Sequence, residues 1–278
     1  MSDLADYHIH SRFSPDSRAE IAQICEAAIA RGLREIAVTD HVDSGPEDRP
    51  GAFRAIEYLA EIERCRARYG DRLTIRAGLE IGEPHLFPEQ TATALAAGAF
   101  DLVIGSAHYA DGMQPAWRPA YFDQPLRAAY EGYFRQVIGL AAGGDWDVLG
   151  HLDLIKRDAR KLGLPYDGPT PYAETIRAAL AHVVERGKGI EINTSPLYRG
   201  QPEPCPALEI LRWYRELGGE ILTFGSDAHT PDAVAAHFPH QAQRLRDVVT
   251  WLDRLPGRLE APAVLAKLDA VAGRVLKR

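Results

Sequence analysis

Cysteine is scarce in this chain of 278 residues, and no pattern connects the three that are present, Cys25, Cys65 and Cys205. Their number is odd, and their positions lack the spacing of a sulfur-bound metal site. A disulfide framework and a structural zinc site built on thiolates are therefore not expected. Such cysteine usage is typical of a reducing compartment, which predicts a cytoplasmic protein.

Long apolar runs and a basic charge balance are also missing. No run approaches the roughly 20 apolar residues that span a bilayer, and the first residues lack the basic and apolar regions of a signal peptide. The formal net charge of −7 creates no global field that attracts long nucleic acid. A composition of 46% hydrophobic and 26% charged residues predicts an ordinary globular protein. No linker interrupts the chain, so we expect one domain over residues 1–278. The sequence does not indicate an oligomeric state.

Short apolar runs alternate with longer amphipathic stretches along the whole chain. Strands that alternate with helices build βαβ units, so this pattern predicts a parallel sheet of seven strands in an α/β fold. Residues 36–38 are apolar in succession, as in strands that are buried on both faces. The segments 111–125, 161–171 and 196–206 are predicted to be loops with a functional role. The predicted strands are Asp6–His10, Glu35–His41, Leu73–Gly82, Asp101–His108, Asp147–Asp153, Gly189–Asn193 and Glu220–His229, and the predicted helices are residues 18–31, 51–69, 88–97, 125–142, 171–186, 206–217 and 240–253.

Histidines gather at the ends of the predicted strands. Six of the ten histidines lie there, and the C-terminal ends of parallel strands face the ligand site. His8 and His10 are two residues apart, so on a strand both imidazoles point to the same face, about 7 Å apart at the backbone. The same spacing of two residues occurs in His151 with Asp153 and in Asp227 with His229. His41, Glu80 and His108 lie at the ends of three other predicted strands.

The donor types indicate which metals this edge of the sheet would bind. Imidazoles and carboxylates without thiolates suit Zn, Mn or Fe. The donors outnumber those that a single ion can use. The sequence therefore predicts a cluster of two to three divalent transition-metal ions at the C-terminal strand ends.

Five short motifs carry all of these residues except Glu80, namely Asp6–Asp16, Thr39–His41, Gly105–His108, Gly150–Asp153 and Gly225–His229. Together they resemble the motifs of the polymerase and histidinol phosphatase (PHP) family, from Asp6 to about Thr230. The resemblance implies a distorted (β/α)7 barrel, which agrees with the seven predicted strands. The chain length, the Ser-Pro-Asp sequence that ends at Asp16, and the segment 191–195 are similar to the histidinol-phosphate phosphatase branch of that family.

The same resemblance implies ligands for three metal ions. Glu80 would bridge the first ion and the second. Asp16 stands where many relatives carry histidine, and a carboxylate remains a competent ligand. The implied ligands are His8, His10, Glu80 and Asp227 for the first ion, Glu80, His108 and His151 for the second, and His41, His229 and Asp16 for the third.

A phosphate monoester is a dianion that repels an anionic nucleophile, so its hydrolysis needs positive charge and a ready hydroxide. Paired metal ions supply both, and arginines bind phosphoryl oxygens bidentately. Arg157 and Arg199 follow predicted strands and are the candidates for this role, with Lys156 a third choice for substrate binding. Asp227 is the candidate proton donor to the leaving group. Three further carboxylates are predicted to orient ligand imidazoles, namely Asp6, Asp40 and Asp153.

The sequence thus predicts an enzyme, a metal-dependent phosphatase that converts L-histidinol phosphate to L-histidinol and phosphate in histidine biosynthesis. Its partner would be a small phosphorylated molecule. A PHP phosphoesterase that acts on nucleotides or short oligonucleotides is the alternative. A metal-dependent amidohydrolase is disfavoured because no lysine ends the fourth predicted strand. A degenerate scaffold module is disfavoured because every expected ligand position holds a competent ligand.

Overall fold

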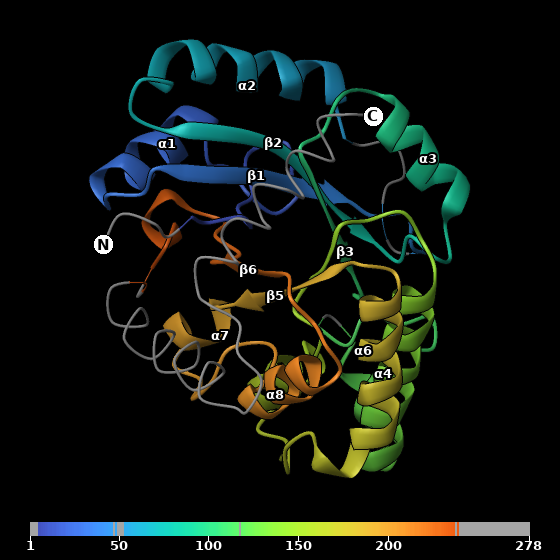
Figure 1. Ribbon diagram of the computed structural model, residues 1–278. Coiled ribbons are helices and arrows are strands. Elements are labelled where there is room, and N and C mark those ends of the chain that lie inside the picture. Colours follow the sequence, from blue (N-terminus) through green and yellow to red (C-terminus); the bar gives the residue numbers. More distant parts are fainter. Residues whose placement is uncertain (1–4, 47, 49–52, 117, 237, 239–278) are drawn as a thin grey trace.

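The computed structural model describes residues 5–46, 48, 53–116, 118–236 and 238. Its centre is a six-stranded parallel sheet in which the strands are neighbours in sequence order (Figure 1). The α/β class that the alternating pattern predicts is confirmed. The strands are β1 (Glu35–Val42), β2 (Thr74–Gly82), β3 (Leu102–Ser106), β4 (Val148–Leu149), β5 (Gly189–Asn193) and β6 (Leu222–Gly225).

The register of β1 and β2 brings two predicted ligands together. The pair runs in parallel from Glu35 opposite Thr74 to Val42 opposite Ile81, and it places His41 opposite Glu80. Both strands are buried over most of their length, as expected for a sheet that is covered on both faces.

The segment that corresponds to the first predicted strand, Asp6–His10, forms isolated bridges instead of a regular strand. Asp6 bridges to Ile36 of β1, and Ile9 bridges to Ala228 beyond β6. The Tyr7 N–H donates to the carbonyl of Phe224 over 2.8 Å. The segment therefore lies between β1 and β6 and occupies the seventh position of the barrel. The prediction of a regular strand here is wrong because the backbone bonds alternate between two neighbours and the chain then turns.

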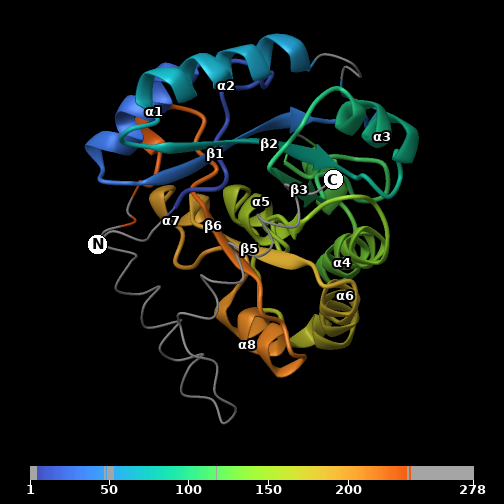
Figure 2. The ribbon, with the colours of Figure 1, turned by 45° about the horizontal axis from the view of Figure 1, so that its top comes forward.

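Helices cover the outside of the sheet. Figures 1 and 2 show α1 and α2 over β1 and β2, and α4, α6 and α8 on the side of the later strands. Six predicted helices are confirmed with small shifts at their ends, and the predicted helix 240–253 lies outside the described residues. The helices are α1 (Ile21–Ala30), α2 (Ala55–Tyr69), α3 (Pro88–Ala96), α4 (Leu126–Ala142), α5 (Ile155–Lys161), α6 (Ala173–Glu185), α7 (Ser195–Tyr198) and α8 (Leu208–Glu216), with 3-10 turns at Pro119–Phe122, Thr170–Tyr172 and Pro231–Ala233.

Helix α2 shows how the sequence directs this packing. Tyr58, Ile62, Cys65 and Tyr69 are buried, and their spacing of three to four residues places them on one stripe of the helix. The stripe packs in the apolar cluster that also includes Ile36 of β1. Burial of one such large apolar side chain contributes about 1.5–3 kcal/mol, so the stripe fixes this helix on the barrel.

The first predicted functional loop, 111–125, contains the 3-10 turn Pro119–Phe122 but no longer helix among its described residues. Two short helices that the sequence analysis did not predict, α5 and α7, lie shortly after β4 and β5 in the chain. Within the described ranges, every helix is too short or too polar to cross a membrane.

Candidate metal centre

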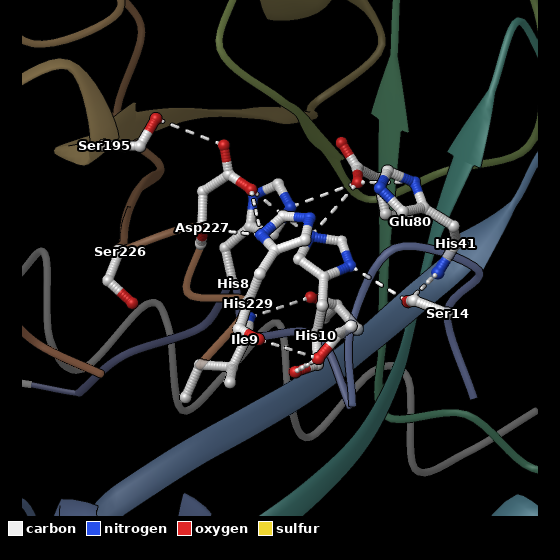
Figure 3. A network of polar contacts seen from close by, with 12 residues as sticks. His8, Ile9, His10, Ser14, His41, Glu80, Ser195, Ser226, Asp227 and His229 are labelled. Atoms are coloured by element: carbon white, nitrogen blue, oxygen red, sulfur yellow. Dashed lines mark hydrogen bonds and ion pairs between the residues drawn. The ribbon is translucent and has the colours of Figure 1, made fainter. Parts of the chain in front are cut away.

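Glu80 contacts a cluster of histidines from several segments of the chain, and Figure 3 shows it together with His8, His10, His41 and His229. Its carboxylate lies on β2 with 1% of the residue exposed. The Nε2 atoms of His8 and His151 lie 3.2 Å from Oε2 and 2.9 Å from Oε1. His41, His108 and His10 add ring nitrogens at 3.1, 3.3 and 3.5 Å from a Glu80 oxygen. Five imidazoles, from four segments of the barrel, therefore surround one carboxylate.

The surroundings make Glu80 strongly acidic. Burial alone would raise the pKa of its carboxyl group, but the positive charges of His8, His41 and His108 outweigh burial and hold the pKa well below its usual range. Glu80 is therefore an anion at neutral pH, which is the form in which a carboxylate binds metal.

Several donor atoms in this cluster are buried without a hydrogen-bond partner among the described residues. They include Nε2 of His8, Nε2 of His10 and Oε2 of Glu80. An unpaired buried polar atom is costly and calls for a specific explanation. All of these atoms are metal-ligand types that face a common centre, so the cluster fits bound cations.

The donors also have the mutual spacing that coordination requires. Four groups of three residues each offer ligand atoms within 4.8 Å of one another. Since imidazole and carboxylate donors without sulfur suit Zn, Mn or Fe, the residues fit the predicted kind of ion. The groups are His8, His10 and Asp227; His8, Glu80 and His151; His41, Asp43 and His108; and His10, His41 and His229.

The structure places Asp16 beside His229 and His41, the two other residues that were predicted to hold a third ion. Oδ2 of Asp16 lies 2.9 Å from Nε2 of His229 and 3.7 Å from Nε2 of His41. Burial would raise the pKa of Asp16, but the hydrogen bond from His229 and the charge of His41 lower it below its usual range. An ionised carboxylate thus faces two imidazoles here.

Asp227 has an unusual backbone conformation, with φ at 53°. Such a left-handed conformation is uncommon for a residue with a side chain and is often found at functional sites. The Asp227 N–H donates to the carbonyl of His8 over 2.8 Å. Oδ1 then lies 3.4 Å from Nε2 of His10, while Oδ2 accepts the hydroxyl of Ser195 over 3.1 Å. One carboxylate oxygen of Asp227 therefore faces the histidines and the other faces Ser195 (Figure 3).

Sequence analysis missed two carboxylates that contact imidazoles of the predicted ligands. Oxygens of Asp43 lie 3.2 Å from Nδ1 of His41 and 3.2 Å from Nδ1 of His108. Oε1 of Glu191 lies 2.6 Å from Nδ1 of His8. Asp43 has the i, i+2 spacing from His41 that identified other ligands, and Glu191 is a charged residue within an apolar strand, so both signals were present in the sequence.

The three aspartates that were predicted to orient imidazoles have other direct contacts. Asp40 accepts the hydroxyl of Ser14 over 2.7 Å, and that hydroxyl lies 3.2 Å from Nδ1 of His10, so Asp40 acts through Ser14. Asp6 accepts the backbone N–H of Ser226 over 2.9 Å and holds the turn before Asp227. Asp153 accepts the backbone N–H of Ala207 over 2.9 Å.

The three candidate cations differ in position. Nη1 of Arg157 lies 3.4 Å from Oδ2 of Asp227, at the edge of the cluster. Arg199 is exposed, with its guanidinium carbon 5.4 Å from the centre of the Tyr198 ring. Lys156 is fully buried, and its Nζ lies 2.8 Å from Oδ2 of Asp153. The ammonium group of Lys156 is therefore held in an interior ion pair, and the two arginines are the stronger candidates for phosphate binding.

Known proteins resemble this chain in sequence and in fold. Residues 6–195 match the PHP domain family. A probable histidinol-phosphatase of Clostridium acetobutylicum is 30% identical over 239 residues, which cover 84% of this chain and 89% of that protein. One of Deinococcus radiodurans is 30% identical over 256 residues, covering 89% and 95%. The crystal structure of histidinol phosphate phosphatase from Lactococcus lactis, in complex with zinc, L-histidinol and phosphate, has a TM-score of 0.75 at 24% identity and covers 91% of this chain and 94% of that one.

Proposed function

The chain belongs to the PHP domain family, and from that membership we propose that it is a histidinol-phosphatase, which hydrolyses L-histidinol phosphate to L-histidinol and phosphate. Two relatives that are 30% identical over most of their length bear the name of that activity. The reaction is a phosphoric monoester hydrolysis in histidine biosynthesis, and its partner is a small phosphorylated substrate.

The observation that carries this proposal is the arrangement around Glu80. Nitrogens of five imidazoles lie within 3.5 Å of its two buried oxygens, and several of these donors have no partner among the described residues. We infer two to three divalent ions, of Zn, Mn or Fe, with Glu80 shared between two of them. Bound ions of this kind lower the pKa of a water molecule and neutralise phosphoryl oxygens. The proposed ligands are His8, His10, Asp16, His41, Glu80, His108, His151, Asp227 and His229.

Arg157 is the proposed phosphate-binding residue closest to these ligands. Its side chain is almost entirely buried, and one guanidinium nitrogen already contacts Asp227. A guanidinium group presents several N–H donors in a plane, so it can hold Asp227 and still donate to phosphoryl oxygens. Arg199 would add a second guanidinium directly after α7. Its neighbour Tyr198 donates its hydroxyl to the Asp227 carbonyl over 3.5 Å.

Asp227 is the proposed carrier of the proton that the leaving group needs. Burial raises the pKa of its carboxyl group, but the hydrogen bond from His10 and the charges of His8 and His229 hold it well below its usual range. Asp227 is therefore ionised in the metal-free protein, and a carboxylate that binds metal is ionised as well. It would accept a proton from the attacking water and then donate it to the departing alkoxide oxygen.

Phosphate release from purified, manganese-loaded protein tests the function. We expect kcat/KM for L-histidinol phosphate to exceed that for each member of a nucleotide panel by at least about 10²-fold, a difference near 2.7 kcal/mol. Comparable or higher efficiency on a nucleotide would favour the phosphoesterase alternative. Release from no phosphomonoester at full metal loading would contradict the proposal.

A further inference from the structure

Glu191 is a buried carboxylate on β5, with 1% of the residue exposed. Sequence analysis gave it no role, and it is not among the proposed metal ligands. We propose that Glu191 is a positioning residue, which fixes the proton of His8 on Nδ1 and thereby presents the Nε2 lone pair to the metal cluster. This inference rests on the proposed metal site.

The two ring nitrogens of His8 face different carboxylates. Nδ1 lies 2.6 Å from Oε1 of Glu191, and Nε2 lies 3.2 Å from Oε2 of Glu80. Nε2 is one of the buried donor atoms that lack a hydrogen-bond partner among the described residues. Nδ1 is thus the nitrogen in a short hydrogen bond, and Nε2 is the nitrogen available to an ion.

An ionised carboxylate can only accept hydrogen bonds. When His8 is neutral, as a metal ligand must be, it carries one N–H. Glu191 keeps that N–H on Nδ1, since the opposite tautomer would place the Nδ1 lone pair against a carboxylate oxygen. The second hydrogen bond of a ligand histidine selects its tautomer and ring orientation in this way.

The other oxygen of Glu191 is also surrounded by donors. Oε2 accepts the backbone N–H of His151 over 2.9 Å and the Nδ2 amide of Asn193 over 3.2 Å. The Asn193 amide cannot simply turn around, because its Oδ1 accepts the backbone N–H of Ser195 over 3.0 Å. Both oxygens of Glu191 therefore have to act as acceptors. Glu191 also connects two proposed ligands, because it contacts the ring of His8 and the backbone of His151.

The neighbouring strand leaves room for this contact. A Cβ atom added at Gly225 of β6 would lie 2.2 Å from Oε1 of Glu191 and 2.3 Å from Cβ of His8. Both distances are too short for real atoms, so a side chain at this position would push the pair apart. The absence of a side chain at Gly225 is thus part of the arrangement that lets Glu191 reach His8.

The near-isosteric variant Glu191→Gln tests the proposal directly, because it should reverse the tautomer of His8. The two donors of His151 and Asn193 would hold the glutamine oxygen, so the glutamine NH2 would face Nδ1 of His8. Nδ1 would then have to accept, and the proton would move to Nε2, where it blocks the lone pair that a metal needs. Glu191→Ala leaves the His8 tautomer free. Glutamine should therefore weaken metal binding at least as much as alanine does.

Metal affinity, measured by competition with a chelator, is the first readout. We expect Glu191→Gln to weaken zinc and manganese binding by roughly 10- to 100-fold, the usual effect of losing such a partner. The matched control is Glu35→Gln, because Glu35 lies at the start of β1 and bonds Tyr7 and Arg76. The Glu35→Gln variant should bind metal with the affinity of the wild type. Wild-type affinity in Glu191→Gln, or a loss clearly smaller than in Glu191→Ala, would overturn the proposal.

The position of the imidazole proton is the second readout, and it needs no variant. Nitrogen-resolved spectra of the zinc-loaded wild-type protein should place the His8 proton on Nδ1. A proton on Nε2 would overturn the proposal even if the variants failed to fold. Neither readout involves substrate, so the positioning role and the phosphatase activity can fail separately.

Discussion

The guanidinium group of Arg157 contacts the carboxylate of Asp227, with Nη1 3.4 Å from Oδ2. The other oxygen of that carboxylate faces Nε2 of His10 over 3.4 Å. One aspartate therefore connects an arginine to a ligand histidine. The position of Arg157 next to the cluster depends on the same residue that is proposed to bind metal.

Replacement of this arginine should affect catalysis more than metal binding. We expect Arg157→Ala to lower kcat/KM on L-histidinol phosphate by roughly 10²-fold, or about 3 kcal/mol of transition-state stabilisation. Arg157→Lys should restore only part, because an ammonium group lacks the planar fork. Elemental analysis should find unchanged metal content. The control is Arg64→Ala, at an exposed residue of α2. If both variants had the same kcat/KM, Arg157 would have no role in the site.

Arg199 gives a second kinetic prediction. Arg199→Ala should lower kcat/KM by on the order of 10²-fold if its guanidinium reaches the phosphate, and Arg199→Lys should recover part of the loss. An exposed side chain with no catalytic role would change the free energy of unfolding by less than about 0.5 kcal/mol and leave the kinetics alone. Steady-state kinetics of both variants decide between these outcomes.

Loss of the central carboxylate should release metal. In Glu80→Ala, we expect metal to be lost from both positions that share Glu80, and activity to fall by orders of magnitude. The reason is that the imidazoles would then face each other without the anion that holds them together. Elemental analysis and turnover measure both effects against Glu89→Ala, at an exposed residue of α3. Full metal content with normal turnover in Glu80→Ala would show that its assignment is wrong.

Metal uptake should release protons. In the metal-free protein, burial alone would lower the pKa of His41, but Glu80 and Asp43 raise it to about 10. His41 thus keeps its proton through neutral pH and must lose it to bind an ion, so metal affinity should rise as pH rises toward 10. His10 is already neutral, because burial and the charges of His229 and His41 lower its pKa to about 3.

Calorimetry of metal binding in buffers with different ionisation enthalpies measures this proton release. A binding heat that does not depend on the buffer near pH 7 would contradict the predicted exchange of a proton for an ion.

Gly82 provides a prediction about Asp43. A Cβ atom at Gly82 would lie 2.2 Å from Oδ1 of Asp43 and 3.2 Å from Nδ1 of His108. Gly82→Ala should therefore displace Asp43 and lower metal affinity by about 10-fold, and Asp43→Asn should act in the same direction. Chelator competition tests both. An effect in Gly82→Ala alone would assign the loss to the backbone and not to Asp43.

Hydrophobic periodicity was enough to predict most of the fold and the place of the cluster. The strand that carries Glu80 and the long helix α4 both have strong patterns, and the i, i+2 spacing identified His8 with His10. Helices α5 and α7 were missed because they have 7 and 4 residues, too few for a periodic pattern to be visible.

The contacts between side chains could not be predicted in the same way. Which carboxylate meets which imidazole depends on the curvature of the sheet and on small spaces such as those at Gly82 and Gly225. The spacing of His41 and Asp43 was visible in the sequence, but only the register of β1 with β2 shows that His41 lies opposite Glu80. The irregular pairing of residues 6–10 likewise follows from their two neighbours and not from their composition.

The segment 6–10 carries two proposed ligands and also joins the first strand of the barrel to the last. The carbonyl of Asp6 accepts the N–H of Ala37, and the N–H of His10 donates to the carbonyl of Ala228 over 2.8 Å. A bound ion would therefore hold these two segments together, since His10 lies in residues 6–10 and Asp227 follows β6. Metal binding would thus stabilise the closed barrel, and metal loss would favour local opening between residues 6–10 and the segment that follows β6.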